Sequence, residues 1–496
     1  MRRPNRRPNY MELEDIVNYE TVSDYLVFID GTSYVAINGD TGAELSRGPD
    51  AATVINLALA KTGCIFIKTG TYPIKSQLDI PSNTSLHGCG KTTILQRHAD
   101  LGAVALIENA DTGAGNDNIE ICNLTIDGND AGHAVASFGI RLVIVTRALV
   151  KDLYIYDTGL DGIHLRTCSH CEIRGINLNN TGNHAIFVGY TSSYCLVSDI
   201  ISVDPKTEHV CIEWQAVADD NIYITVSDVT GSGAENQGIY IQHAQHILIS
   251  NCSVYDTFNS GFTLRDCDDV LVNNCISDTT TTNDKACFET VITATNVIFN
   301  CCAAYNAESG EASGFVLYGT RITLANSIAS GCKRGVETHV TSSDYIDVHN
   351  CIFEDYSWGI LVTGDFIKYH DNIFSNPDGA VSYCFYVEAS TNIEIYNNDV
   401  RAACTGAEIR NYDAADRVED NAGWVTENSG VSGVIADAAT INHGLAVAPT
   451  HVVITGTVAG EIVNVTAIGA ANFTVAIKSN AGAAGTNQAI YWIARE

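Results

Sequence analysis

One short pattern recurs along most of this chain: a small residue opens a segment in which apolar and variable residues alternate. Alternation of this kind is typical of a β-strand with one buried face. The pattern occurs twelve times, with successive copies 21 to 27 residues apart. Their opening residues are Gly139, Gly162, Ala185, Cys211, Gly238, Gly261, Cys287, Gly314, Gly335, Gly359, Cys384 and Gly406. Such a repeat predicts a stack of similar units, each covering the apolar face of its neighbour.

A second predicted strand follows later in each unit and ends at a turn where Asn stands beside Cys or Ser. Segments 247–252, 270–275 and 346–351 each end in Asn-Cys. Because equivalent turns lie one above another in a stack, the Asn amides can hydrogen-bond from unit to unit. We also expect an interior file of small, reduced side chains. Its members are Cys252, Cys275, Cys302 and Cys351.

The sequence argues against folds that need helices between strands. A doubly wound sheet or a TIM barrel requires an amphipathic helix of about ten or more residues in each connection, and the repeat contains none. The Leu/Asn template of a leucine-rich repeat is also missing. We therefore predict an all-β solenoid, a parallel β-helix of about 12 coils, with an N-terminal cap and a small C-terminal β domain.

The region before the repeat carries a family resemblance. Residues 50–61 form an amphipathic helical pattern, followed by strand-like segments at 64–72, 78–81 and 86–93. This order resembles the N-terminal cap of the pectate-lyase-like superfamily, which includes polysaccharide lyases, glycosidases and phage tailspikes. The resemblance covers about residues 50 to 420. It implies a right-handed parallel β-helix and leaves the reaction open.

The ends of the chain suggest further parts. Alternating segments at 450–455, 462–466, 473–478 and 489–493 predict a C-terminal β domain, and the 441–450 region resembles small C-terminal domains of viral tail proteins. The tailspike resemblance implies a homotrimer, with this domain serving oligomerisation or receptor binding. We divide the chain into a basic flexible arm (1–20), N-terminal strands and cap (21–98), β-helix (99–421), linker (422–433) and C-terminal β domain (434–496).

The net charge of the chain limits the partners that it can bind. The chain has 27 Lys+Arg against 58 Asp+Glu, a net charge of −31, which repels nucleic acid and anionic membranes. No apolar run is long enough for membrane insertion, and no signal peptide is visible. The exception is a basic N-terminus containing Arg2, Arg3, Arg6 and Arg7. This arm is either a charged tail or an anchor to an acidic partner such as a virion baseplate or tail.

The outer face of the repeated strands is the predicted binding surface. In the first seven units, the second and fourth residues after the opening residue are mostly polar or aromatic. Aromatic faces cover sugar C–H groups, whereas amides and arginines bind hydroxyls or carboxylates. The alternative is an ordinary solvated sheet face. The predicted substrate-binding residues are Arg141, Arg166, Phe187, Gln215, Tyr240, Gln242 and Arg265.

Five residues are candidates for catalysis: Asp161, His164, Glu213, Asp266 and Glu289. Hydrolysis needs two carboxylates at a suitable separation, and Glu213 is expected two coils, about 9.6 Å, from His164. Glu213 and Glu289 are expected about 14 Å apart, too far to act together. A lyase would need a base near an arginine, which His164 and its neighbour Arg166 supply. The motifs of polygalacturonases and calcium pectate lyases are missing.

No cofactor or metal is expected. Asp266, Asp268 and Asp269 are the alternative, as Ca²⁺ ligands, although their spacing is not that of an oxygen cage. We predict a virion or extracellular surface spike that binds, and in one version depolymerises, cell-surface polysaccharide. The alternatives are a secreted polysaccharide lyase or glycoside hydrolase, and a non-enzymatic structural or adhesive protein.

Overall fold

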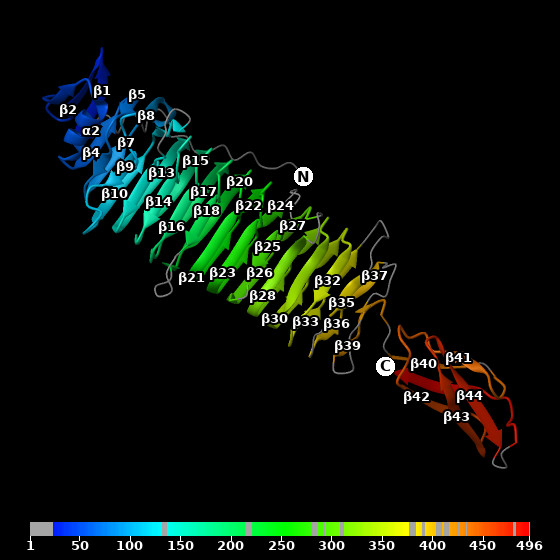
Figure 1. The fold of residues 1–496 in the computed structure, drawn as a ribbon. Coiled ribbons are helices and arrows are strands. Elements are labelled where there is room, and N and C mark those ends of the chain that lie inside the picture. The colour runs from blue at the N-terminus through cyan, green and yellow to red at the C-terminus, as the bar shows by residue number, and fades with distance from the viewer. Residues whose placement is uncertain are drawn as a thin grey trace.

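The computed structural model describes thirteen parts of the chain, and the basic arm at 1–20 lies outside them. These parts are residues 23–130, 136–213, 221–278, 285–291, 293–307, 312–375, 383–388, 392–402, 409–410, 416–424, 427–432, 434–479 and 483–495. Most of them form one long stack of coils, seen as a rod in Figure 1. The stack has about 13 turns and almost no helix, so the predicted fold class is confirmed.

Strand pairings run along the stack in three lines, which we call sheets 1, 2 and 3 in their order along each coil. Neighbouring strands of these lines are parallel throughout. Sheet 1 contains β6 (Leu78–Ile80), β9 (Ile107–Asn109), β12 (Ile140–Val143), β14 (Ile163–Arg166), β16 (Ile186–Gly189), β18 (Val210–Glu213), β25 (Phe288–Thr290), β32 (Trp358–Val362), β35 (Tyr383–Val387), β38 (Ile409–Arg410) and the first parts of β21 (Ile239–Ser250), β23 (Phe262–Asn273), β28 (Ser313–Ala325) and β30 (Arg334–His349).

Sheets 2 and 3 form the other two faces. Sheet 2 contains β4 (Gly63–Ile67), β7 (Thr84–His87), β10 (Asn116–Cys122), β19 (Asn221–Ile222), β26 (Thr295–Asn300), β33 (Lys368–His370), β36 (Glu394–Tyr396), β39 (Arg417–Glu419), the later parts of β21, β23, β28 and β30, and the first parts of β13 (Val145–Tyr156), β15 (Glu172–Asn179), β17 (Leu196–Val203) and β20 (Thr225–Ser232). Sheet 3 contains the later parts of β13, β15, β17 and β20. Its other strands are β5 (Gly70–Ile74), β8 (Thr93–Arg97), β11 (Thr125–Asp127), β22 (Ser253–Tyr255), β24 (Ile276–Asp278), β27 (Ala303–Tyr305), β29 (Ile328–Ser330), β31 (Ile352–Glu354), β34 (Ile373–Ser375) and β37 (Asp399–Ala402).

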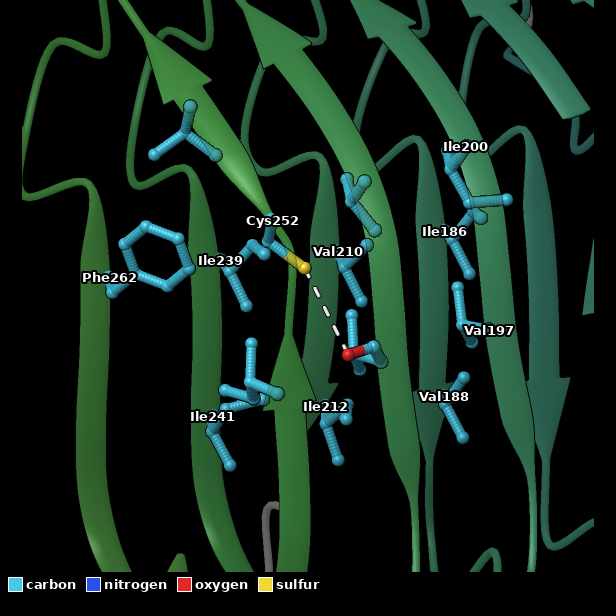
Figure 2. Close-up of a cluster of buried hydrophobic side chains, with 14 of the residues drawn as sticks. Ile186, Val188, Val197, Ile200, Val210, Ile212, Ile239, Ile241, Cys252 and Phe262 are labelled. Carbon is cyan, nitrogen blue, oxygen red and sulfur yellow. Dashed lines mark hydrogen bonds between the residues drawn. The ribbon is translucent and has the colours of Figure 1, made fainter. Parts of the chain in front are cut away.

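The interior of the coils is a continuous apolar core in which like side chains stack. Figure 2 shows isoleucines and valines of successive coils arranged this way, together with Cys252 and Phe262. The rings of Phe262, Phe288 and Phe315 stack at centroid distances of 4.7 and 5.0 Å. The predicted file of Cys252, Cys275, Cys302 and Cys351 is buried and unpaired, as expected. Each coil therefore supplies the apolar contacts that the next coil needs.

The predicted asparagine ladder is also present at the turn after sheet 2. Asn251 and Asn274 have φ values of 55° and 54°, a left-handed conformation that Asn tolerates better than most residues. The Asn274 amide donates to Asn251 Oδ1 at 2.8 Å, and that of Asn326 donates to Asn300 Oδ1 at 2.8 Å. Side-chain hydrogen bonds thus link the coils where the backbone changes direction.

A helix and three antiparallel strands lie at the N-terminal end of the stack. At the N-terminal end, α2 (Ala51–Leu59) is capped by the Asp50 side chain, which accepts from Ala52 N, and it buries Val54 and Ile55. The antiparallel strands β1 (Tyr25–Asp30), β2 (Ser33–Asn38) and β3 (Glu44–Gly48) join the stack through β4, and a short 3₁₀ helix, η1, spans Gly90–Thr92. Trp424 is 4% exposed and belongs to the same core at the other end. No helix in the described ranges is long and apolar enough to cross a bilayer.

Two small antiparallel sheets follow the stack. The first contains β40 (Glu427–Val431), β45 (Ile490–Arg495) and β42 (His451–Gly456), and the second β41 (Thr440–Asn442), β44 (Asn472–Ser479) and β43 (Glu461–Ile468). They enclose a core of their own around Phe473 and Trp492. The strand β40 falls within the segment 422–433 that the sequence suggested as a linker, and it pairs along β45.

Candidate functional site

The outer face of sheet 1 presents two files of side chains, one residue from each coil. The first file consists of Arg141, His164, Phe187, Cys211, Tyr240, Thr263 and Glu289. The second file includes Arg166, Gly189 and Glu213, and continues through Gln242 and Arg265. Together they form a polar and aromatic strip, which we call the sheet 1 strip. It contains the predicted binding residues that the structure describes; Gln215 lies outside the described residues.

The register corrects the predicted position of Glu213. The repeat pattern treated Cys211 as the opening residue of its coil, which would place Glu213 in line with Phe187. Instead, Phe187 pairs with Cys211, and Glu213 pairs with Gly189. The opening residue is His209, whose carbonyl accepts from Ile186 N at 3.1 Å. A shift of two residues keeps every side chain on the same face, so alternation alone could not detect it.

The structure brings Asp161 and His164 together. His164 Nδ1 lies 2.6 Å from Asp161 Oδ2, and the imidazole ring stacks on Phe187 with 4.6 Å between centroids. Asp161 also accepts from Asn183 Nδ2 at 2.7 Å. The neighbouring Arg166 guanidinium is 4.4 Å from the centre of the Tyr190 ring. Asp161, His164 and Asn183 therefore form a hydrogen-bonded group beside the strip.

The other predicted residues form separate groups. Arg141 pairs with Glu108 at 3.2 Å. Tyr240 donates to Gln242 Oε1 at 2.6 Å, and burial raises the pKa of this phenol to about 12. Arg265 Nε lies 3.5 Å from Asp266 Oδ2. These pairings leave side chains of both charges along the strip.

Glu289 belongs to a different hydrogen-bond set from Asp266, the catalytic candidate on the neighbouring coil. Its Oε2 accepts from Ser260 Oγ at 2.8 Å. The aspartates proposed as the calcium alternative also diverge, since Asp268 accepts from Asn296 Nδ2 at 2.7 Å and Asp269 lies 3.2 Å from His246. Each of these carboxylates has its own partner, which is not the convergence that an oxygen cage requires.

Sequence reasoning missed His184 and Glu208, which lie beside the first file. His184 Nδ1 is 3.5 Å from Asp161 Oδ1, and its Nε2 is 3.3 Å from Glu208 Oε2. Burial lowers the pKa of His184 and raises that of Glu208 to about 7. Both residues directly precede an opening residue, as Asp161 does. In the sequence pattern this position marks only His184, because the repeat placed the opening residue of the next coil at Cys211 and not at His209.

Among the residues that the structure describes, two groups of three side chains have the ligand types and spacing of metal sites. His184, Glu208 and Cys211 form one, and His87, Glu120 and Cys122 the other; in each, one ligand atom per residue lies within 4.8 Å of the others. In the His87 group, Lys151 Nζ is 2.8 Å from Glu120 Oε1. The hydrogen bond from His87 and the Lys151 ammonium together lower the pKa of Glu120 to about 2.

Comparison with known proteins agrees with this architecture. Residues 161–310 and 210–368 match a family described as the right-handed β-helix region. The chain is a right-handed parallel β-helix that resembles phage tailspikes. The preneck appendage protein of Bacillus phage PZA and the pre-neck appendage protein of Bacillus phage phi29 are each 26% identical to it over 197 residues, 39% of this chain and 19% of the relative. The chain thus aligns with about a fifth of the length of these curated relatives.

Solved structures share the β-helix fold. The phage phi29 gene product 12 N-terminal fragment has a TM-score of 0.63 at 15% identity, covering 74% of this chain and 71% of that one. A mutant tailspike protein of E. coli bacteriophage HK620 has a TM-score of 0.56 at 12% identity, with 92% of each chain covered. The mannuronan C-5 epimerase AlgE6 A-module of Azotobacter vinelandii has a TM-score of 0.51 at 15% identity, covering 70% and 94%.

Proposed function

We propose that this chain is a virion-associated spike or appendage that binds cell-surface polysaccharide along the sheet 1 strip. The observation that carries the proposal is the strip itself, in which arginine, aromatic and amide side chains repeat at the spacing of the coils, about 4.8 Å. Support comes from relatives named as phage appendage proteins and from a tailspike with the same fold.

The arginines of the strip offer binding positions for the carboxylates of an acidic glycan. The chain as a whole has a net charge of −31, yet Arg141, Arg166 and Arg265 lie on this one face. The Arg265 side chain is 53% exposed, so its guanidinium is accessible. Guanidinium groups bind carboxylates through paired hydrogen bonds, and a half-buried Tyr240 offers an apolar surface beside them.

Glycan binding by paired variants tests this proposal. Tyr240→Ala with Arg265→Ala should weaken binding to a panel of acidic polysaccharides at least about tenfold. The matched control is Tyr396→Ala with Arg417→Ala on sheet 2, where the guanidinium lies 4.8 Å from the ring centre. Equal loss in both double variants, or unchanged binding in the first, contradicts a site on sheet 1.

Depolymerisation of the bound glycan is a second candidate, favoured by the 2.6 Å contact between Asp161 and His164. In this version, His164 acts as the base beside Arg166, and Asp161 orients the imidazole. The test measures new reducing ends and the ultraviolet absorbance of unsaturated products. Reducing ends without absorbance indicate hydrolysis, and Glu213→Gln and Glu289→Gln then identify the acid. Absorbance that is lost in His164→Gln indicates elimination. Binding without either signal leaves a non-enzymatic spike.

A homotrimer is part of the same proposal. The sheet β40–β45–β42 has an exposed apolar face where Val431 lies opposite Tyr491 and Val453 opposite Ile493. Exposed apolar patches of this kind are typical of contact surfaces. Ile493→Lys should convert a trimer to monomers in analytical ultracentrifugation, whereas Thr466→Lys on the exposed strand β43 should not. A wild-type monomer at micromolar concentration contradicts the trimer.

A further inference from the structure

We propose that His184, Glu208 and Cys211 form a binding site for a divalent transition metal ion of the zinc class. The three ligand atoms, an imidazole nitrogen, a carboxylate oxygen and a sulfur, lie within 4.8 Å of one another. Nitrogen, oxygen and thiolate ligands of this mixture suit zinc and similar ions, not calcium or magnesium. The site goes beyond glycan binding, and neither depends on the other.

The chain holds these ligands in one place through its coil geometry. Cys211 lies in the first file of the sheet 1 strip, whereas His184 and Glu208 occupy equivalent turn positions before β16 and β18. Those two strands are adjacent in sheet 1. Hence two neighbouring coils present all three ligands to one point beside the strip.

The surrounding groups match the outer shell of a metal site. Asp161 Oδ1 lies 3.5 Å from His184 Nδ1, which leaves Nε2 directed toward Glu208 at 3.3 Å. Asp161 Oδ1 also accepts from the His184 backbone N at 3.1 Å, so this carboxylate holds the turn that carries the imidazole and lies beside its second nitrogen, as carboxylates near metal-bound histidines do. Asn236 Nδ2 donates to Glu208 Oε1 and so fixes the other oxygen of that carboxylate.

Charge also favours a cation here. Glu208 is 4% exposed and Cys211 is 1% exposed, and the charges of the nearby Asp161 and Glu213 disfavour ionisation of Glu208. Among the residues that the structure describes, none of these three carboxylates is paired with a lysine or arginine. Buried carboxylates are ordinarily paired, protonated or bound to a metal, and a divalent ion would satisfy Glu208 and the Cys211 thiolate together.

The ligand count leaves one position open. Three protein ligands occupy three corners of a tetrahedron, and the fourth remains for water or another small ligand. The His184 side chain is 13% exposed, so one edge of the site lies close to solvent. His184 also contacts Phe187 of the strip, with 5.2 Å between ring centroids, so an ion there would lie beside the proposed glycan surface.

Cobalt titration of the reduced full chain tests the site. We expect one equivalent of Co²⁺ to produce tetrahedral ligand-field bands and a thiolate charge-transfer band, both abolished by one equivalent of Zn²⁺. Cys211→Ser should remove the charge-transfer band, and His184→Gln should weaken cobalt binding at least tenfold. The matched controls Cys122→Ser and His87→Gln, in the group of the same composition, should leave the spectrum unchanged.

Two results would overturn the proposal. One is a wild-type chain without tetrahedral bands at millimolar Co²⁺. The other is a charge-transfer band that survives Cys211→Ser and disappears in Cys122→Ser. Circular dichroism confirms folding of each variant. If Cys211→Ser does not fold, cobalt binding by His184→Gln decides the question, because a substitution close to the surface disturbs the core less.

Discussion

Two clusters in the solenoid contain the same three residue types but differ in what neutralises them. His87, Glu120 and Cys122 lie on β7 and β10 of sheet 2, and Cys122 Sγ is 3.0 Å from His87 Nδ1. Here Lys151 supplies a positive charge from the next coil. We call this the lysine-filled cluster, and we call His184, Glu208 and Cys211 the open cluster.

The difference shows in the two glutamates. Glu120, beside His87 and Lys151, has its pKa lowered to about 2, whereas burial raises that of Glu208 to about 7. One carboxylate is ionised and balanced by a side chain, and the other lacks such a balance in the described structure. The ligand set alone therefore does not identify a metal site; the presence or absence of a built-in cation decides which cluster has room for an ion.

The largest expected effect is stabilisation of the fold by zinc, which should depend on the open cluster and not on the lysine-filled cluster. At a free Zn²⁺ concentration about 100 times Kd, binding to the folded state should raise the free energy of unfolding by about 2.7 kcal/mol. Cys211→Ser should abolish this gain in urea unfolding, whereas Cys122→Ser should retain it. A gain that depends on Cys122 instead would reverse the assignment of the two clusters.

Removal of the Lys151 ammonium should change the free energy of unfolding slightly less than zinc binding does. Lys151→Met leaves Glu120 partly buried without its ammonium partner, and we expect a loss of about 2 kcal/mol in the free energy of unfolding at neutral pH. Lys206→Met is the control, because its partner Glu235 is exposed and such pairs contribute about 0–1 kcal/mol. If Lys151→Met also gains tetrahedral cobalt binding, occupancy by lysine is what keeps the first cluster free of metal.

Acid should reduce the contribution of the lysine-filled cluster to the free energy of unfolding as Glu120 becomes protonated. The folded pKa of Glu120 is about 2 against an ordinary 4.5, so its contribution is full above pH 4.5 and is lost as pH falls toward 2. Glu120 is 25% exposed, which reduces the expected loss to about 1–2 kcal/mol. Unfolding measured at steps between pH 5 and 2.5 should show a shallower decline in Glu120→Gln than in the wild type. Parallel curves would mean that the pairing contributes nothing.

The smallest effect concerns the outer shell of the open cluster. Asp161→Asn removes the carboxylate beside His184 Nδ1 and should weaken zinc binding about tenfold, equivalent to about 1.4 kcal/mol. Asp157→Asn serves as the control because Asp157 lies in the neighbouring turn and accepts from Asn180. Competition with a chromophoric chelator measures both. Equal affinity in the two variants would limit Asp161 to a structural role.

The repeat predicted the fold well because its determinants are local. Alternation defined the strands, and Asn251 and Asn274 marked turns whose left-handed backbone favours that residue. The buried file that includes Cys252 followed from the same reading. These features depend on neighbours in sequence or on the repetition itself, so the stack could be expected without coordinates.

The candidate site was only partly predictable. In the sequence pattern the repeats are 21 to 27 residues apart, whereas the structural register makes the coil from His209 to Gly238 29 residues long. Because coil length varies this much, the register of the β18 coil could slip by two residues and misplace Glu213. His184 and Glu208 lie in turns, where no alternation points to them. The role of Lys151 depends on pairing between β10 and β13, which determines that it meets Glu120. Contacts between coils of unequal length required the structure.

The covered N-terminal end of the stack limits how this chain can pair with another. The terminal coil of a parallel β-helix exposes a row of backbone donors and acceptors that would accept another coil, including one from a second molecule. The helix α2, with Val54 and Ile55 buried, covers the stack at this end. A substitution that unfolds this helix would expose an apolar edge that can pair with other strands, which is a hazard for aggregation.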